Sequence, residues 1–338
     1  MAKLRVGMIN GLNQSVIDAC HKISVSTVTD FISAKVEVIA RQASISITEV
    51  SSMRRKLLSK YALMPINGSH LYQMLIDKMA VITTDLTGIN NATFLIQLCS
   101  LDHLLDGGLY TGEVVEFIGK SGSGKSQICM HIAGFSASTT SNGTIYIDTC
   151  GSIQPSRINE IVKEHFSHNS MENHDALSRL LCVRVHDIFE LISTLQGLQE
   201  KLNFECSGIY GKLRLLIIDS IASVITPVLT IPNNHGHSLM TSLARILRVL
   251  AVECGICVLV TNFTVTGGNA ALGRTWSSVP DVRVSIRTIE SFKTTKGNER
   301  IATLVKSSRQ PTQISTNFYI GDGGLLSTAP CSSKSLLK

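Results

Sequence analysis

Eight residues, Gly119 to Ser126, constrain the fold of this chain more than any other segment. They read Gly-Lys-Ser-Gly-Ser-Gly-Lys-Ser, which fills every fixed position of the pattern Gly-x-x-x-x-Gly-Lys-(Ser/Thr). The apolar run 114–118 before them is typical of a short buried strand, and residues 127–133 after them have helical spacing. A glycine-rich loop between a strand and a helix can surround phosphate with backbone N–H groups. The segment therefore predicts an α/β fold that binds a nucleoside triphosphate.

The residue types of this loop suit that chemistry. Gly119, Gly122 and Gly124 allow backbone conformations that other residues rarely adopt. We expect Lys125 to reach the β- and γ-phosphates and the Ser126 hydroxyl to ligate Mg²⁺. The alternative, a flexible Gly/Ser loop without a ligand, is weakened by the strand and helix that flank it. The predicted nucleotide-binding residues of the loop are Gly119, Lys120, Ser121, Gly122, Ser123, Gly124, Lys125 and Ser126.

A second candidate for the same site is Asp219. The apolar run 215–218 is typical of a buried strand, and Asp219 follows it directly. In phosphate-loop enzymes, an aspartate at the carboxyl end of such a strand holds the Mg²⁺. An aspartate in this place can also simply begin a turn. Downstream of a phosphate loop, the metal role is the favoured interpretation.

Composition and charge narrow the class of protein. Of the 338 residues, 44% are hydrophobic and 17% are charged, which is typical of globular proteins. A chain of this length can form two domains. No apolar run is long enough to span a bilayer, and the nine scattered cysteines favour reduced thiols, so we expect an intracellular protein without a membrane partner. Residues 1–78 carry ten Lys or Arg against five Asp or Glu, a basic excess that suits polyanions or acidic partners. The same excess is also ordinary for a solvated domain.

The pattern of apolar residues divides the chain. Residues 1–64 read as a small all-helical domain, and 65–100 as a linker with an insertion at 90–99. Residues 101–326 alternate strands with helices, which favours a mostly parallel sheet, and the Ser-rich tail 327–338 is expected to be disordered. The expected strands are 114–118, 144–148, 181–185, 213–219 and 256–261. The expected helices are 127–136, 157–166, 188–202 and 239–253.

Further segments share one known pattern: Leu101–Glu113, Tyr146–Gly151, Thr261-Asn262 and Lys306–Pro311. Together with the loop and the Asp219 strand, they resemble the RecA-type strand-exchange recombinases. Among eukaryotic paralogues of that family the resemblance is to the D type, through Gly112–Val114, Ala271–Ser277 and Lys306–Pro311. It covers nearly the whole chain. It implies a RecA-like P-loop NTPase core with a mostly parallel central sheet, preceded by a small helix-hairpin-helix-like N-terminal domain.

The resemblance also implies a function. It predicts an ATP- and DNA-binding subunit of a recombination-mediator complex, acting in homologous recombination repair of DNA double-strand breaks and stalled forks. The implied cofactors are ATP and Mg²⁺. The implied partners are other recombinase paralogues and single-stranded or branched DNA, and the implied location is the nucleus. Two alternatives stay open: an active DNA-dependent ATPase that exchanges strands, and a structural adaptor that uses ATP only as an ordering ligand.

Three departures from the family pattern bear on these alternatives. Cys150 stands where the active recombinases have a Glu that polarises the attacking water, so we expect weak hydrolysis with ATP binding retained. Phe263 stands where they have a Gln that links the γ-phosphate to a DNA loop. In the family, the Thr-Gly-Ile segment runs almost directly into Ser-Leu-Asp, whereas here residues 90–99 separate Thr87-Gly88-Ile89 from Ser100.

The DNA-binding candidates are Arg274, Trp276, Arg54 and Arg55. By resemblance, the glycine-rich stretch between Thr264 and Pro280 is a DNA-binding loop, and an Arg with an aromatic suits single strands. The alternative is that Trp276 packs on the core or on a neighbouring subunit. Arg54 and Arg55 either face phosphate or belong to a solvated helix face. Lys306–Pro311 resembles the segment that caps the ATP of an adjacent subunit.

Overall fold

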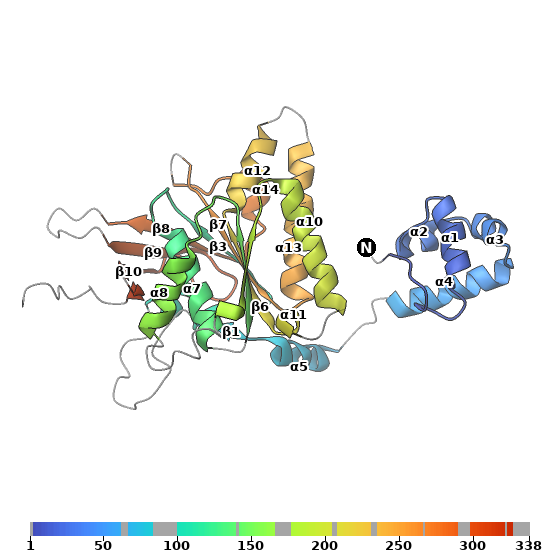
Figure 1. Cartoon of the computed structure of the whole chain (residues 1–338), viewed down its shortest axis with the longest axis horizontal. Coiled ribbons are helices and arrows are strands. Elements are labelled where there is room, and N and C mark those ends of the chain that lie inside the picture. The colour runs from blue at the N-terminus through green and yellow to red at the C-terminus, as the bar shows by residue number, and fades with distance from the viewer. Residues whose placement is uncertain are drawn as a thin grey trace, which may run out of the picture. The chain divides into compact units, whose positions relative to one another are not determined.

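The structure is a computed structural model that describes residues 3–61, 67–83, 100–139, 142–165, 177–204, 208–230, 235–265, 268–289, 298–321 and 323–326. The chain divides into two compact units, Met1–Met74 and Leu75–Lys338 (Figure 1). The expected insertion 90–99 and tail 327–338 lie outside the described residues.

Within the described residues, four helices build the core of the first unit: α1 (Gln14–Lys22), α2 (Val28–Ser33), α3 (Val36–Ala43) and α4 (Ile47–Tyr61). Local capping fixes where the helices begin. The Asn13 side chain accepts from the Val16 N–H at the start of α1, and Thr27 and Asp30 form a reciprocal capping box at the start of α2. The unit has its own core, whose fully buried side chains are Phe31, Ile39, Val50 and Leu57.

The second unit contains a nine-stranded sheet within its described residues, in the order β11-β10-β9-β8-β3-β7-β6-β4-β5. Six neighbouring strands, β8, β3, β7, β6, β4 and β5, run parallel. At the β8 side of the sheet, β9, β10 and β11 continue it with antiparallel pairings. The strands are β3 (Val114–Ile118), β4 (Gly143–Asp148), β5 (Leu180–Arg184), β6 (Leu213–Asp219), β7 (Cys257–Asn262), β8 (Val282–Thr288), β9 (Glu299–Lys306), β10 (Ser315–Gly321) and β11 (Gly324–Leu326).

Helices cover both faces of this sheet, as Figure 1 shows. One face carries α7 (Lys125–Thr139) and α8 (Pro155–His165). The other carries α10 (Ile188–Phe204), α12 (Ile221–Leu229) and α13 (His235–Val252). Since successive residues of a strand point to opposite faces, each strand serves two cores. On β6, Leu215 and Ile217 pack toward α7, whereas Leu216 and Ile218 pack toward α13.

The remaining elements are α5 (Gly68–Lys78), β1 (Val81–Ile82), α6 (Ser100–Leu104), β2 (Leu109–Tyr110), α11 (Gly208–Gly211) and α14 (Gly273–Ser277). The segment 65–100, expected to be a linker, thus includes α5 and β1, and β1 pairs antiparallel with β2. Among the residues that the structure describes, no helix is both long and apolar enough to cross a membrane. The predicted fold class, a RecA-like core with a mostly parallel sheet after a helical N-terminal domain, is confirmed.

Candidate nucleotide-binding site

The glycine-rich loop joins β3 to α7, and its glycines are required by close contacts. A Cβ on Gly119 would lie 2.4 Å from the Ile286 carbonyl oxygen of β8, and one on Gly124 would lie 2.5 Å from Ile320 Cδ1. Gly122 and Gly124 have φ of 77° and 104°, which side chains disfavour. The loop therefore packs closely against β8 and β10, and glycine is the residue that its backbone accommodates at these positions.

Lys125 is the first residue of α7, and its ammonium folds back over the loop. Its Nζ donates to the carbonyls of Gly119, at 2.8 Å, and Lys120, at 3.0 Å. Burial lowers the pKa of Lys125, and the carboxylate of Asp219 opposes that shift. A bound phosphate would add a second negative charge beside this half-buried ammonium, which favours anion binding here.

Asp219 ends β6 with its carboxylate held by hydroxyl groups. It is 3% exposed and accepts hydrogen bonds from Tyr146 Oη at 2.9 Å, from Ser152 Oγ at 3.1 Å and from Thr261 Oγ1. Burial raises the pKa of Tyr146, so its phenol stays protonated and serves as a donor. Three donors from three segments fix the orientation of this carboxylate.

The residues present fit a magnesium ion. The Ser126 hydroxyl and the Asp219 carboxylate line the same cavity, and both offer the hard oxygen ligands that Mg²⁺ prefers. No group of three or more His, Cys, Asp or Glu side chains with metal-site geometry occurs in the described part of the chain. That fits Mg²⁺, which usually takes its other ligands from water and nucleotide phosphates.

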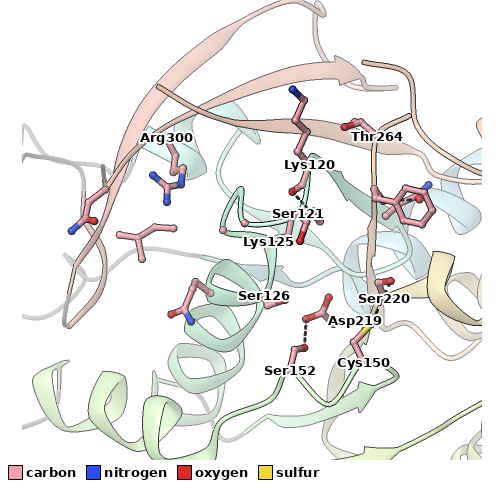
Figure 2. A pocket seen from close by; sticks show the side chains of 17 residues that line it. Lys120, Ser121, Lys125, Ser126, Cys150, Ser152, Asp219, Ser220, Thr264 and Arg300 are labelled. Carbon is pink, nitrogen blue, oxygen red and sulfur yellow. Dashed lines mark hydrogen bonds between the residues drawn. The ribbon is translucent and has the colours of Figure 1, made fainter. Parts of the chain in front are cut away.

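These groups surround a cavity of about 710 Å³, large enough for a nucleotide. Figure 2 shows Lys125, Ser126 and Asp219 on one side and Arg300 across from them. The lining residues are Lys120, Ser121, Gly122, Gly124, Lys125, Ser126, Gln127, Cys150, Ser152, Asp219, Ser220, Asn262, Phe263, Thr264, Asn298, Arg300 and Ile320. The structure thus brings most of the predicted loop residues together with Asp219.

The cavity lacks an evident general base. Asp219 is the one carboxylate that lines it among the described residues, and Cys150 lies on the same wall with its Sγ 3.9 Å from Ser220 Oγ. Asp148 is buried and accepts from the N–H groups of Cys150 and Ser152, both at 3.1 Å, and of Ile153 at 3.2 Å. Its carboxylate therefore shapes the loop after β4 and does not face the cavity.

Part of the wall comes from residues that sequence reasoning missed. Arg300 and Ile320, on β9 and β10, line the cavity beside Gly124, and Arg300 Nε donates to the Ser123 carbonyl at 3.0 Å. Arg300 lies 177 positions from Ser123 in sequence, Ile320 lies farther along the chain, and neither belongs to a local motif. Only sheet pairing brings them to the phosphate loop.

The DNA-binding candidates have different surroundings. Trp276 is fully buried in the core under α13, so its ring cannot stack on a base without leaving the protein interior. Arg54 donates to the carbonyls of Phe31 and Ala34 and so closes the end of α2. The placement of Trp276 supports the packing alternative, and that of Arg54 a structural role. Arg274 and Arg55 are exposed.

The segment 306–311 makes its contacts within the chain. Lys306 Nζ donates to the carbonyls of Ser277, Ser278 and Pro280. Arg309 forms a two-pronged ion pair with Glu113, at 2.9 and 3.2 Å. The side chains of Lys306 and Arg309 therefore bind to residues of their own domain.

Comparisons with known proteins agree with this architecture. The family described as Rad51 matches residues 95–328, and the family described as "RAD51D, N-terminal domain" matches residues 1–60. The chain belongs to the Rad51 family. Its N-terminal match confirms the predicted resemblance to the D-type paralogues of this family.

Relatives of this Rad51-family chain align along nearly its whole length. DNA repair protein RAD51 homolog 4 of Bos taurus is 34% identical over 329 residues, covering 96% of this chain and 97% of that protein. The protein of the same name from Mus musculus is 33% identical over 335 residues, 98% of each chain. The Dictyostelium discoideum protein named probable DNA repair protein RAD51 homolog 4 is 28% identical, covering 82% of this chain and 84% of its own.

Proposed function

We propose that this Rad51-family chain is an ATP-binding subunit of a recombination-mediator complex in homologous recombination repair. Its substrate context is the single-stranded or branched DNA of double-strand breaks and stalled forks, in the nucleus, beside other recombinase paralogues. The names of its relatives, which are DNA repair proteins, support the biological setting. The relationship to further Rad51 paralogues, such as RAD51 homolog 2 of Mus musculus, supports paralogue partners.

The observation that carries the proposal is the composition of the cavity. The groups for binding Mg-ATP are complete: the loop amides, Lys125, the Ser126 hydroxyl and the fixed Asp219 carboxylate. Cys150, which stands where the family resemblance places the hydrolytic Glu, lines the cavity with a thiol instead. A cavity built this way binds ATP and holds it, so the nucleotide orders the protein more than it drives a reaction cycle.

Two measurements on the purified chain test this proposal. One is the rate of ATP turnover with and without single-stranded DNA, and the other is Mg-ATP binding by calorimetry. We expect binding in the wild type, loss of binding in Lys125→Ala, and wild-type turnover no higher than that of this variant. Turnover well above Lys125→Ala and stimulated by DNA would support the active recombinase alternative. Mg-ATP binding without any heat of binding to single-stranded DNA in the same calorimeter would support the structural adaptor alternative.

A further inference from the structure

The nucleotide cavity has two sides, which would face different parts of a bound nucleotide. Mg²⁺ in phosphate-loop sites bridges oxygens of the β- and γ-phosphates. Because Ser126 and Asp219 fit that ion, a nucleotide held at the loop directs its γ-phosphate toward Asp219 and its nucleoside the other way. Figure 2 shows Arg300 on the side of Lys125 that lies away from Asp219. The two sides can therefore be compared by the charges that they offer.

The wall on the Asp219 side lies at the carboxyl ends of β4, β6 and β7, and among the described residues it contains no Lys, Arg or His. We call it the γ-side wall, and it consists of Cys150, Ser152, Ser220, Asn262, Phe263 and Thr264. Phe263 contributes an apolar ring that is 37% exposed, and the other side chains are a neutral thiol, hydroxyls and an amide. A neutral donor binds an anion about half as strongly as a charged one. This wall therefore offers a terminal phosphate no charged partner.

Two polar groups of the γ-side wall are already engaged within the protein. Asn262 is fully buried, and its Nδ2 donates to Glu116 Oε1 at 2.8 Å. The Asn262 Oδ1 accepts from the Phe263 N–H, also at 2.8 Å. Ser152 Oγ donates to the Asp219 carboxylate at 3.1 Å. Either group would have to give up these hydrogen bonds in order to hold a phosphate, and a bond lost at a buried group is costly.

The positive charge of the cavity lining lies instead at the loop and beside it. Lys125 belongs to the loop motif, and Arg300 Nε donates to the Ser123 carbonyl at 3.0 Å. A Cβ on Gly124 would lie 3.6 Å from Arg300 Nε, so the guanidinium is adjacent to the loop backbone. Lys120, the third cation of the described lining, is exposed, and solvent screens its charge. The cations held in place are therefore those that face the β-phosphate and the nucleoside end.

We propose that the cavity recognises the diphosphate part of a nucleotide, and that it binds nucleoside diphosphates and triphosphates with similar affinity. This inference rests on the proposed binding of Mg-ATP. Specificity is a difference between two affinities, so a preference for ATP needs a group that contacts the γ-phosphate alone. The γ-side wall supplies no charged group of that kind. Because a ligand shifts a conformational equilibrium only by its differential affinity, replacing ATP by ADP leaves the ordering effect of the nucleotide unchanged.

Calorimetric titrations of the full-length chain with ATP, ADP and AMP at saturating Mg²⁺ test the proposal. We expect the Kd values of ATP and ADP to differ by less than about tenfold, the contribution of one charge-assisted hydrogen bond. We expect AMP to bind at least about tenfold more weakly than ADP, since AMP lacks the phosphate that the loop and Lys125 would hold. A larger difference between ATP and ADP, or a smaller one between ADP and AMP, would overturn the proposal.

The variant Phe263→Lys places a cation on the γ-side wall. We expect this variant to bind ATP at least about tenfold more tightly than ADP, because the new ammonium contacts only the longer ligand. Phe189→Lys is the matched control, since it makes the same substitution at a ring that is 62% exposed on α10, outside the cavity lining. The control keeps the wild-type ratio of the two Kd values. Equal affinities in a folded Phe263→Lys variant would overturn the placement of the γ-phosphate at this wall.

Arg300→Ala tests the other side of the cavity. We expect it to weaken ATP and ADP binding by the same factor, about tenfold, whereas Arg184→Ala, at an exposed position on β5, leaves both unchanged. Weaker binding of ATP alone in Arg300→Ala would contradict the assignment of this residue to the diphosphate part. If Phe263→Lys does not fold, the wild-type titrations decide. Tight ATP binding with weak ADP binding in the wild type would overturn this proposal alone, and absence of binding heat for both would also overturn the proposed function.

Discussion

In the proposed function, single residues of the cavity separate the binding of a nucleotide from its hydrolysis. Lys125 and Asp219 each have several hydrogen-bond partners, so the charges proposed to bind phosphate and metal are held in place. Cys150 lies on the same wall but brings no carboxylate. Asp148 is turned to the backbone of its own loop. The proposal thus assigns the difference between binding ATP and hydrolysing it to one side chain, Cys150.

Cys150→Glu tests this difference. We expect ATP turnover to rise by about 10²-fold, because a positioned general base typically contributes that much or more. The measurement is steady-state phosphate release with saturating Mg-ATP. Cys182→Glu serves as the control, since Cys182 is an exposed cysteine on β5 outside the cavity, and it should leave turnover unchanged. Equal turnover in the two variants would mean that a missing carboxylate is not what limits hydrolysis.

At the scale of elements, Arg309 and Gln310, which follow β9, hold the first elements of the second unit's core in place. Arg309 pairs with Glu113, donates to the Leu105 carbonyl at 3.0 Å, and lies over the Tyr110 ring at 3.8 Å from its centroid. The neighbouring Gln310 donates to the Leu104 carbonyl. These contacts tie α6, β2 and the residue before β3 to a segment about 200 positions away in sequence.

Arg309→Ala should lower the free energy of unfolding by about 3 kcal/mol, since removing one partner leaves a largely buried carboxylate without compensation. The side chains of Arg309 and Glu113 are only 19% and 16% exposed. Arg248→Ala is the matched control. Arg248 is 48% exposed where it pairs with Asp281, and such pairs contribute about 0.5 kcal/mol. Urea unfolding measures the free energy of unfolding of both variants. A similar decrease in the two would contradict a stabilising role of the Arg309–Glu113 pair.

The loss in Arg309→Ala should depend on pH. Burial raises the pKa of Glu113, and Arg309 opposes that rise. Without Arg309 the pKa of Glu113 rises further. A carboxyl group whose folded pKa exceeds its unfolded value destabilises the fold as pH rises, because the unfolded chain binds fewer protons. The variant should therefore lose more stability at pH 8 than at pH 5, measured by urea unfolding against the wild type. An equal loss at both pH values would show that Glu113 is not the group left uncompensated.

At the scale of the whole molecule, the chain has two units with separate cores. The first unit buries Phe31, Ile39 and Val50 among the helices α1 to α4, in a core that includes no residue of the sheet. The second unit buries two layers, one on each face of its sheet. Stability and nucleotide binding should therefore respond separately to changes in each unit.

Val50→Ala should lower the stability of the first unit by about 2 kcal/mol, because it leaves a cavity in that core. Val38→Ala, at a position 46% exposed on α3, should cost well under 1 kcal/mol. Thermal unfolding of the full chain measures both, and calorimetry should show unchanged Mg-ATP binding in each. A similar loss in the two variants would argue against the described core.

Mg-ATP should stabilise the second unit. At a concentration 100 times its Kd, a ligand that binds only the folded state adds about 2.7 kcal/mol, which raises Tm by about 5–10 °C for a unit of this size. Differential scanning calorimetry should show this shift for the wild type and not for Lys125→Ala. The absence of a shift in the wild type would contradict nucleotide binding itself.

Most of what the sequence by itself determined is local. Apolar periodicity and loop chemistry act over a few residues. They therefore sufficed to predict the phosphate loop at Gly119–Ser126, the buried strands around it and four long helices of the core. The family resemblance was also visible, because it rests on contiguous motifs. The first unit was likewise predicted as a helical domain, from short apolar stretches separated by polar breaks.

Tertiary structure alone decided how distant segments meet. The sequence did not predict β8 to β11, and with them it missed Arg300 and Ile320 on the cavity wall. It could not choose between a DNA-facing and a buried Trp276, because that choice depends on Glu116, 160 positions away. A buried carboxylate must accept hydrogen bonds from nearby donors. The order of the strands in the sheet, and not the distance in sequence, determines which donors lie close enough.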